Sequence, residues 1–123
     1  MTENKLDTLF CTFTPLITLD VTSYVKHNHS VIKGFGNDVA EDLYHGIRNR
    51  SLPTQLHRVA MRKLRYLDNA ADINDLRVPP GNRLEKLSGN RKGQYSIRIN
   101  EQYRICFTWK SGNAYRVEIV DYH

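Results

Sequence analysis

The C-terminal third of the chain alternates apolar and polar residues over three consecutive segments. The segments cover residues 94–100, 103–110 and 114–120, and short polar turns around Glu101 and Gly112 join them. A period of two is typical of a strand with one buried face, and turns of this length connect antiparallel neighbours. The alternation therefore predicts an antiparallel meander, which restricts what the rest of the chain can form.

The same alternation predicts which side chains share a face of the sheet. Two arginines, Arg98 and Arg104, flank the first turn and fall on the face opposite the apolar positions. Guanidinium groups that converge on a sheet face suit a phosphate group. The alternative is a pair of exposed strand arginines, ion-paired with Glu101 or Glu118. The expected core-facing set consists of Tyr95, Ile97, Ile99, Tyr103, Ile105 and Phe107. In the third segment, Tyr115, Val117 and Ile119 alternate with Arg116, Glu118 and Val120.

Two helical segments precede the meander. The first is expected to be capped by Asp38, with Val39, Leu43 and Ile47 on its buried face. The second is expected from Pro53 onward, where apolar residues recur every three or four positions. The buried positions of the second helix are Leu56, Val59, Ala60, Leu64, Leu67 and Ala71, and its outer side carries Arg58, Arg62 and Arg65.

A short β-branched run, Val31–Phe35, predicts a strand before the helices. Two helices followed by a run of strands indicate an α+β fold, in which both helices pack on one face of an antiparallel sheet of about four strands. Residues 1–30 show no sustained period, and we interpret them as an N-terminal extension to a domain of residues 31–123. The extension is expected to be flexible and dispensable, or to result from a start codon assigned too far upstream.

The basic charge of the chain is concentrated in one segment. The whole chain has a net charge of +5, and residues 77–116 hold nine basic and two acidic residues. Residues 1–30, in contrast, hold two basic and three acidic residues. A basic segment of this kind suits a polyanionic partner, either a nucleic acid or an acidic protein. A solvated basic surface without a partner is the alternative.

The composition limits the compartment and the kinds of site. Cys11 and Cys106 are the only cysteines, too few for a disulfide framework, so a reducing cytoplasm is expected. No stretch approaches the roughly 18 apolar residues of a membrane span, and no membrane association is expected. His27 and His29 have no third metal ligand in view and are interpreted as part of an exposed linker. We therefore expect no metal and no cofactor.

The last three residues, Asp121-Tyr122-His123, directly follow the third alternating segment. Imidazole is the commonest general acid or base in proteins, and it titrates near neutral pH. If the preceding strand holds the end of the chain in place, His123 becomes a candidate for acid–base chemistry.

Several motifs together resemble a known family. They are the run NRLEKLSGNRKG at residues 82–93, the strand YSIRIN at residues 95–100, the pair Tyr103-Arg104 and the terminal Asp-Tyr-His. From Val31 to the C-terminus the chain is similar to the plasmid-maintenance killer toxins, the HigB-like branch of the RelE/ParE superfamily. The resemblance implies a RelE-like fold and a toxin of a type II toxin–antitoxin system, encoded beside a helix-turn-helix, HigA-like antitoxin.

Toxins of that branch enter the ribosomal A site and cut the messenger RNA there without a metal ion. The 2′-hydroxyl of the RNA attacks the adjacent phosphate, which leaves a cyclic phosphate and releases a 5′-hydroxyl. The resemblance therefore implies a ribosome-dependent endoribonuclease that inhibits translation. Two alternatives remain open: a non-catalytic toxin that binds DNA gyrase, as ParE-type relatives do, and a domain that binds RNA or ribosomal subunits without cutting.

The resemblance also implies roles for individual residues. Arg104 matches the strand arginine that stabilises the phosphate, and Arg98 matches a cationic position on the preceding strand. The terminal Asp121, Tyr122 and His123 match the motif that the HigB-like branch needs for activity. Further RNA contacts are expected from the basic residues Arg83, Lys86, Arg91 and Lys92.

One segment departs from the family pattern. The chain has Glu85-Lys86-Leu87-Ser88 where the best-known pattern has His-Pro-Leu-Lys, so a histidine and a lysine are missing. The candidates for the general base are therefore Glu85 and His123. The departure predicts either a milder toxin or one in which His123 is the base and Tyr122 or water completes the cycle.

Overall fold

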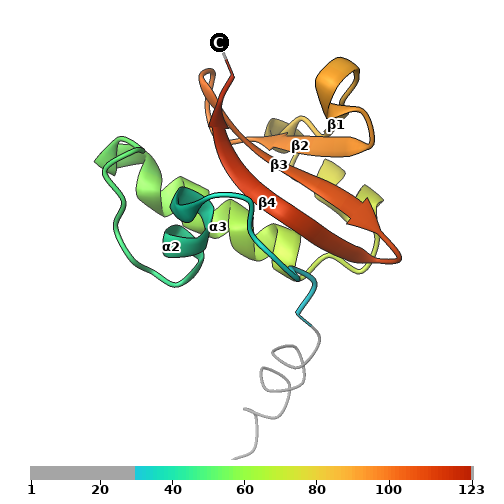
Figure 1. The fold of residues 1–123 in the computed structure, drawn as a ribbon, viewed down its shortest axis with the longest axis horizontal. Coiled ribbons are helices and arrows are strands. Elements are labelled where there is room, and N and C mark those ends of the chain that lie inside the picture. The colour runs from blue at the N-terminus through green and yellow to red at the C-terminus, as the bar shows by residue number, and fades with distance from the viewer. Residues whose placement is uncertain (1–29, 123) are drawn as a thin grey trace, which may run out of the picture. The chain divides into compact units, whose positions relative to one another are not determined.

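The structure, a computed structural model, describes residues 30–122; residues 1–29 of the predicted extension and His123 lie outside the described part. Within it, helices α2 (Asp38–Tyr44) and α3 (His57–Asp68) precede a four-stranded antiparallel sheet (Figure 1). The predicted α+β architecture is confirmed. With 7 and 12 residues, these helices are too short to cross a bilayer, which takes roughly 20.

The sheet consists of β1 (Glu85–Lys86), β2 (Gln94–Arg98), β3 (Tyr103–Lys110) and β4 (Asn113–Asp121). Its spatial order follows the chain, and each neighbouring pair is antiparallel. The predicted meander is therefore confirmed as β2 to β4. Strand β1 has two residues, too few for any periodic signal in the sequence.

The predicted strand Val31–Phe35 lies parallel to β4 but forms two isolated bridges and no continuous ladder. Ile32 pairs with Ala114 and Phe35 pairs with Val117. The reason lies in β4, which contains a β-bulge between these two bridges and so interrupts the pairing.

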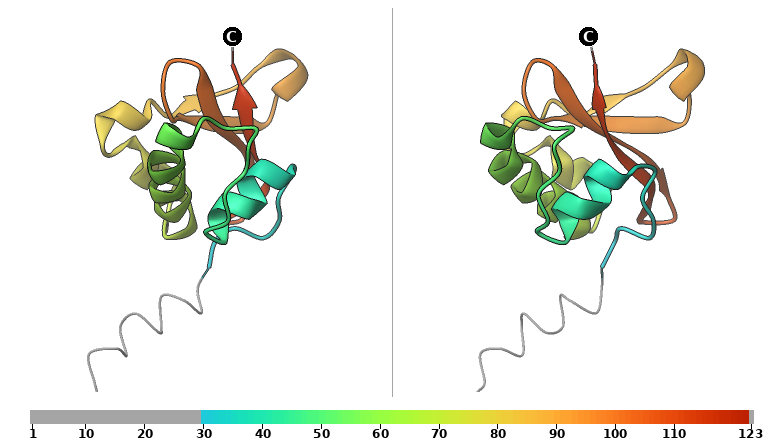
Figure 2. Two further views of the ribbon diagram at one scale, coloured as in Figure 1. Left: turned by 90° about the vertical axis from the view of Figure 1, so that its left-hand side faces the viewer. Right: turned by 60° about the vertical axis from the view of Figure 1, so that its left-hand side comes forward.

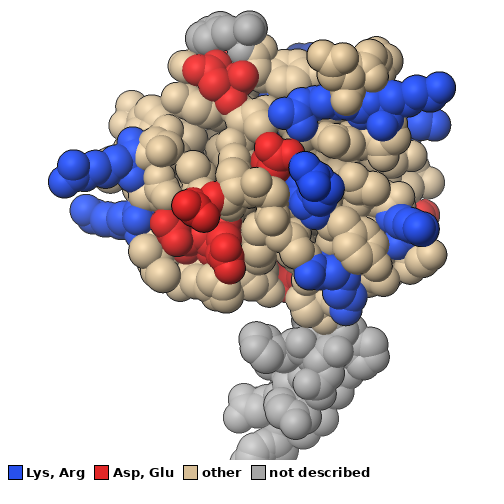
Figure 3. Space-filling model, viewed as in Figure 1, with Lys and Arg blue, Asp and Glu red and all other residues tan. Residues whose placement is uncertain are grey.

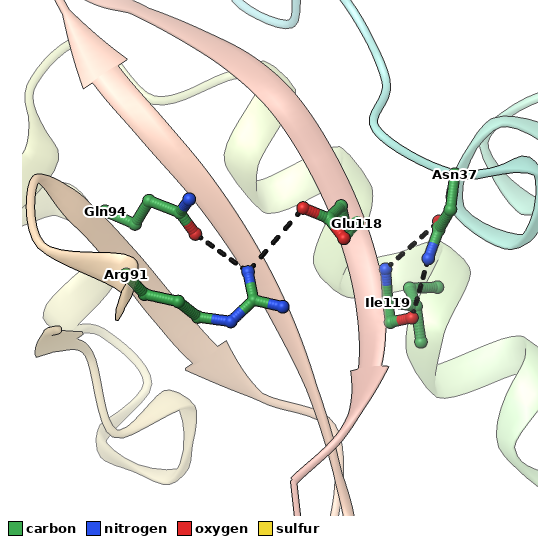
Figure 4. Close-up of polar contacts among 5 residues, drawn as sticks. All are labelled: Asn37, Arg91, Gln94, Glu118 and Ile119. Atoms are coloured by element: carbon green, nitrogen blue, oxygen red, sulfur yellow. Dashed lines mark hydrogen bonds and ion pairs between the residues drawn. The ribbon is translucent and has the colours of Figure 1, made fainter. Parts of the chain in front are cut away.

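Helix α2 begins one residue earlier than predicted, because Asn37 is its cap. The Oδ1 atom of Asn37 accepts a hydrogen bond from the backbone N–H of Ala40 at 3.1 Å. The same side chain donates through Nδ2 to the carbonyl of Ile119 at 2.9 Å, which ties the helix to β4 (Figure 4). The helix ends at Tyr44, so Ile47 lies beyond it and is 54% exposed, not buried as predicted.

Helix α3 follows a short 3-10 turn at Thr54–Leu56. The buried face predicted from its period is confirmed at Ala60, Leu64 and Leu67, and the three arginines of its outer side are exposed. The helix ends at Asp68, before the predicted Ala71, which is exposed. Two polar residues were not expected on the buried stripe, namely His57 and Lys63.

Both helices cover the same face of the sheet, and the core lies between the helices and the sheet (Figure 2). The predicted inward set is largely confirmed, since Ile97, Ile105 and Phe107 are fully buried there. The alternation of the third segment breaks at one position, because Tyr115 lies on the opposite face from Val117 and Ile119 and is 37% exposed. The bulge causes this, because Arg116 and Val117 together oppose Phe107 and the alternation of β4 inverts there.

Candidate active site

Arg104, on the inner strand β3, lies on the sheet face opposite the helices. It is only 7% exposed. Its Nε donates to the Oγ of Ser96 at 2.7 Å, and its Nη2 donates to the backbone carbonyl of Arg83 at 2.7 Å. A guanidinium held by two short hydrogen bonds has little freedom, so its remaining N–H groups point in fixed directions.

One carboxylate lies beside this guanidinium. Glu85 Oε1 is 3.8 Å from Arg104 Nη2, and the Glu85 side chain is 53% exposed. The register places Glu85 opposite Ser96, so both residues share the face that Arg104 occupies. The alternative in which the strand arginines pair with Glu101 or Glu118 is therefore wrong for Arg104, which is buried and has Glu85 as its acidic neighbour.

Arg98 lies directly opposite Arg104 in the β2–β3 pairing and is half-buried. The register therefore places the two arginines opposite each other on one face of the sheet. Side chains of directly opposed residues on one face approach closely, and two like charges in that position repel each other unless an anion lies between or beside them. The arrangement suits an oxyanion such as a phosphate.

Helix α3 contributes a third cation that the sequence analysis missed. Lys63 is 7% exposed, and within residues 30–122 its ammonium group has no hydrogen bond or ion pair. Burial lowers the pKa of Lys63, and the positive charges of Arg62, Arg98 and Arg104 lower it further. The side chain is therefore close enough to the arginine pair to interact with it electrostatically. In the sequence, Lys63 lies on the same helix face as Ala60 and Leu67, and this position could have indicated that it is buried.

The end of β4 lies against the same arginine. The Arg104 guanidinium sits over the ring of Tyr122, 5.5 Å from the ring centre. The Tyr122 N–H donates to the carbonyl of Gln102 at 2.6 Å, and Gln102 Nε2 donates to Asp121 Oδ2 at 3.0 Å. The turn between β2 and β3 thus holds Asp121 and Tyr122 at the site. His123, the next residue, lies outside the described part.

The four predicted RNA-contact residues take different positions around the sheet. Arg83 is exposed and supplies the carbonyl that binds Arg104, whereas Lys86 takes the register position opposite Tyr95, on the other face from Glu85. Lys92 is exposed in the turn before β2. Basic side chains gather around this turn, and acidic ones over α2 (Figure 3).

The fourth residue, Arg91, is already engaged. Its Nη1 donates to Gln94 Oε1 at 3.0 Å and lies 3.6 Å from Glu118 Oε2 (Figure 4).

Burial raises the pKa of the neighbouring thiol of Cys106, so this cysteine is a small core residue and a poor nucleophile. No three His, Cys, Asp or Glu side chains between residues 30 and 122 are grouped to hold a metal ion.

Ser96 is the other site residue that sequence reasoning missed. It is fully buried and accepts the Nε hydrogen bond of Arg104. Its polar place in the alternation of β2, two residues before Arg98, was the signal that could have identified it.

Comparison with known proteins identifies the family of the chain. The model of a family described as RelE-like toxin of type II toxin-antitoxin system HigB matches residues 33–123. Toxin HigB-1 of Vibrio cholerae is 51% identical over 67 residues, which cover 54% of this chain and 70% of that protein. Endoribonuclease HigB of Proteus vulgaris is 34% identical over 61 residues, which cover 50% of this chain and 65% of that protein.

A solved structure of the YoeB-YefM complex from Staphylococcus aureus also matches, with a TM-score of 0.48 and 24% sequence identity. The match covers 75% of this chain and 97% of that chain. The family assignment rests on the family model, which spans most of the chain, and it confirms the predicted resemblance. The chain belongs to the HigB-like family of RelE-like toxins of type II toxin–antitoxin systems.

Proposed function

We propose that this toxin is a ribosome-dependent endoribonuclease that cuts messenger RNA and thereby stops translation. The observation that carries the proposal is the buried Arg104, held by two hydrogen bonds, opposite Arg98 and beneath Tyr122. The name of the Proteus vulgaris relative, Endoribonuclease HigB, supports the activity. A cationic, preorganised group of this kind is what a phosphoryl transition state needs.

In the proposed reaction, the 2′-oxygen of a nucleotide attacks the adjacent phosphorus and the bond from phosphorus to the 5′-oxygen breaks. One proton leaves the 2′-hydroxyl and one proton reaches the 5′-oxygen, so the products are a cyclic phosphate and a 5′-hydroxyl. Arg104 and Arg98 stabilise the negative charge on the crowded phosphate. The fixed position of Arg104 means that its guanidinium needs little reorganisation as that charge develops.

The residues of the C-terminal motif are proposed to transfer the protons. His123 is proposed as the general base, because imidazole titrates near neutral pH, and Tyr122 or water supplies the proton to the leaving oxygen. Asp121 orients the end of the strand through Gln102. Glu85 is the alternative base, but its carboxylate already lies beside Arg104.

As a toxin of a type II toxin–antitoxin system, the protein has an antitoxin as a partner. We propose further that this antitoxin is a HigA-like helix-turn-helix protein and that the toxin acts in the cytoplasm, on messenger RNA held in the ribosome. Arg83, Lys86, Arg91 and Lys92 are proposed to contact RNA around the site. Residues 31–123 are proposed to be the toxin domain, and a variant that begins at Val31 should retain toxicity.

Two variants test the proposal. Arg104→Ala and a deletion of His123 should both abolish growth arrest after induction, and primer extension on messenger RNA from the induced cells should lose its cleavage stops. Folding of each variant is checked by circular dichroism. If both folded variants remain as toxic as the parent, the site is wrong. Growth arrest with DNA damage and intact RNA would point to a gyrase-binding toxin.

A further inference from the structure

The β-bulge in β4 produces an exposed aromatic ring on the same sheet face as the arginine pair. Arg116 has a positive backbone φ of 53°, which is uncommon for a residue with a side chain. The bulge turns Tyr115 away from the helices and leaves it 37% exposed. Bulges that redirect one side chain are frequent beside functional sites, and strained backbone there invites a functional explanation.

Tyr115 lines an open hollow of about 370 Å³ at the β3–β4 hairpin. The other lining residues are Thr108, Lys110, Ser111 and Arg116. The hollow therefore offers one aromatic ring, two cations and two hydroxyl groups, and no carboxylate from residues 30–122 lines it. An aromatic ring for stacking and cations for phosphates is the combination with which proteins bind single-stranded nucleic acid.

The hollow and the arginine pair are linked along β3. Arg104 and Thr108 are four residues apart, so they share one face of the strand and lie roughly 14 Å apart along it. Cys106 is between them, opposite Glu118 on β4. Arg91 is 3.6 Å from the Glu118 carboxylate and compensates its charge. In the described part of the chain, an RNA strand that crosses this face therefore meets no uncompensated acid beside Cys106.

We propose that Tyr115, with Lys110 and Arg116, forms a second RNA subsite that holds a nucleotide on one side of the cleaved bond. A base stacks on the Tyr115 ring while the two cations contact the phosphates next to it. This inference rests on the proposed function, because the occupant is the same messenger RNA that is cut at Arg104. Loss of one stacking contact should weaken RNA binding about tenfold.

The test compares Tyr115→Ala with Tyr115→Phe, which keeps the ring, and with Ile47→Ala as a control for an exposed apolar residue outside this face. Single-turnover cleavage of ribosome-bound messenger RNA is measured against toxin concentration. For Tyr115→Ala the concentration at half-maximal rate should rise about tenfold with the maximal rate unchanged. The phenylalanine variant and the control should match the parent.

Shortened messenger RNAs show whether the contact is with RNA. Removing the nucleotides on the side that Tyr115 contacts should weaken RNA binding by the parent. The parent and Tyr115→Ala should then show the same concentration at half-maximal rate. A Tyr115→Ala variant that equals the parent on the long RNA overturns the subsite. So does a variant that cuts normally but binds the antitoxin less tightly, because the hollow would then be an antitoxin contact. If the parent toxin itself cuts no RNA, the proposed function fails instead.

Discussion

The guanidinium of Arg104 lies over the ring of Tyr122, with its central carbon 5.5 Å from the ring centre. This contact joins the inner strand of the sheet to the end of the chain. The backbone of Tyr122 is fixed as well, by its hydrogen bond to Gln102. Asp121 and Tyr122 are therefore positioned by the fold, although Tyr122 itself is 43% exposed.

Substitution of Tyr122 separates the role of its ring from that of its hydroxyl. Tyr122→Phe keeps the ring over Arg104 and should leave the thermal unfolding temperature unchanged. Tyr122→Ala loses a cation–π contact of about 0.5–1 kcal/mol and frees the guanidinium, so its cleavage rate should fall further than that of the phenylalanine variant. Equal rates for the two variants would show that the ring does not position Arg104.

Ser96→Ala tests whether Arg104 needs its buried anchor. The change leaves the Nε of Arg104 without the partner that now lies at 2.7 Å, and a buried donor without a partner costs about 1–3 kcal/mol. The cleavage rate should fall roughly tenfold or more, since a misplacement of about 1 Å can cost 100-fold. Ser88→Ala, at an exposed serine, is the matched control. A Ser96→Ala variant that is less stable but cuts at the parent rate would assign Ser96 a purely structural role.

The Glu85→Gln variant tests whether Glu85 or His123 is the general base. The Glu85 carboxylate lies 3.8 Å from Arg104 and competes with a phosphate for that guanidinium. Its neutralisation should therefore lower KM for ribosome-bound RNA and reduce kcat by less than about tenfold. Loss of His123 should reduce kcat by roughly 100-fold or more. If Glu85→Gln costs as much as the loss of His123, then Glu85 is the base.

Lys63→Met should make the protein more stable and less active. The folded protein disfavours the ammonium form of Lys63, because its pKa is lowered from 10.5 by burial and by neighbouring arginines. At neutral pH the unfolded chain then holds this proton more tightly, and the charge opposes folding. Removing the charge should therefore raise the Tm of the folded domain.

The pH dependence of this stability difference has a defined sign. Between the lowered pKa and 10.5 the unfolded chain binds more protons, so the parent gains stability as pH rises through that window. The advantage of Lys63→Met in thermal melts should therefore shrink toward pH 10.5. Lys63→Arg retains the charge and should retain activity. If Lys63→Met is as active as the parent, the third cation has no part in the site.

Most of the fold could be predicted from local patterns. The alternation around Ile97 and Ile105 identified the meander, and the short turn between them fixed the opposition of Arg98 and Arg104. The position of Tyr115 could not be predicted, because a bulge adds one residue without changing the apolar pattern. The cap of α2 was off by one residue, since Asn37 and Asp38 are both good caps.

The site was predictable only where a single strand or hairpin determines it. The contact of Arg104 with the carbonyl of Arg83 joins residues 21 positions apart, and no sequence pattern encodes it. Burial of Lys63 depends on how α3 packs against the sheet. Because lysine is normally exposed, the sequence alone does not predict that Lys63 is buried, even though it lies on the apolar stripe.

Arg104 is proposed to stabilise the phosphate during cleavage of messenger RNA. The most direct measurement is the single-turnover cleavage rate of ribosome-bound messenger RNA by Arg104→Ala and Arg104→Lys, at saturating toxin and with folding checked by thermal unfolding. Removal of one preorganised electrostatic group should lower the rate by roughly 100- to 1,000-fold while binding to the programmed ribosome changes little. A folded Arg104→Lys or Arg104→Ala variant that cuts at the parent rate would contradict the account.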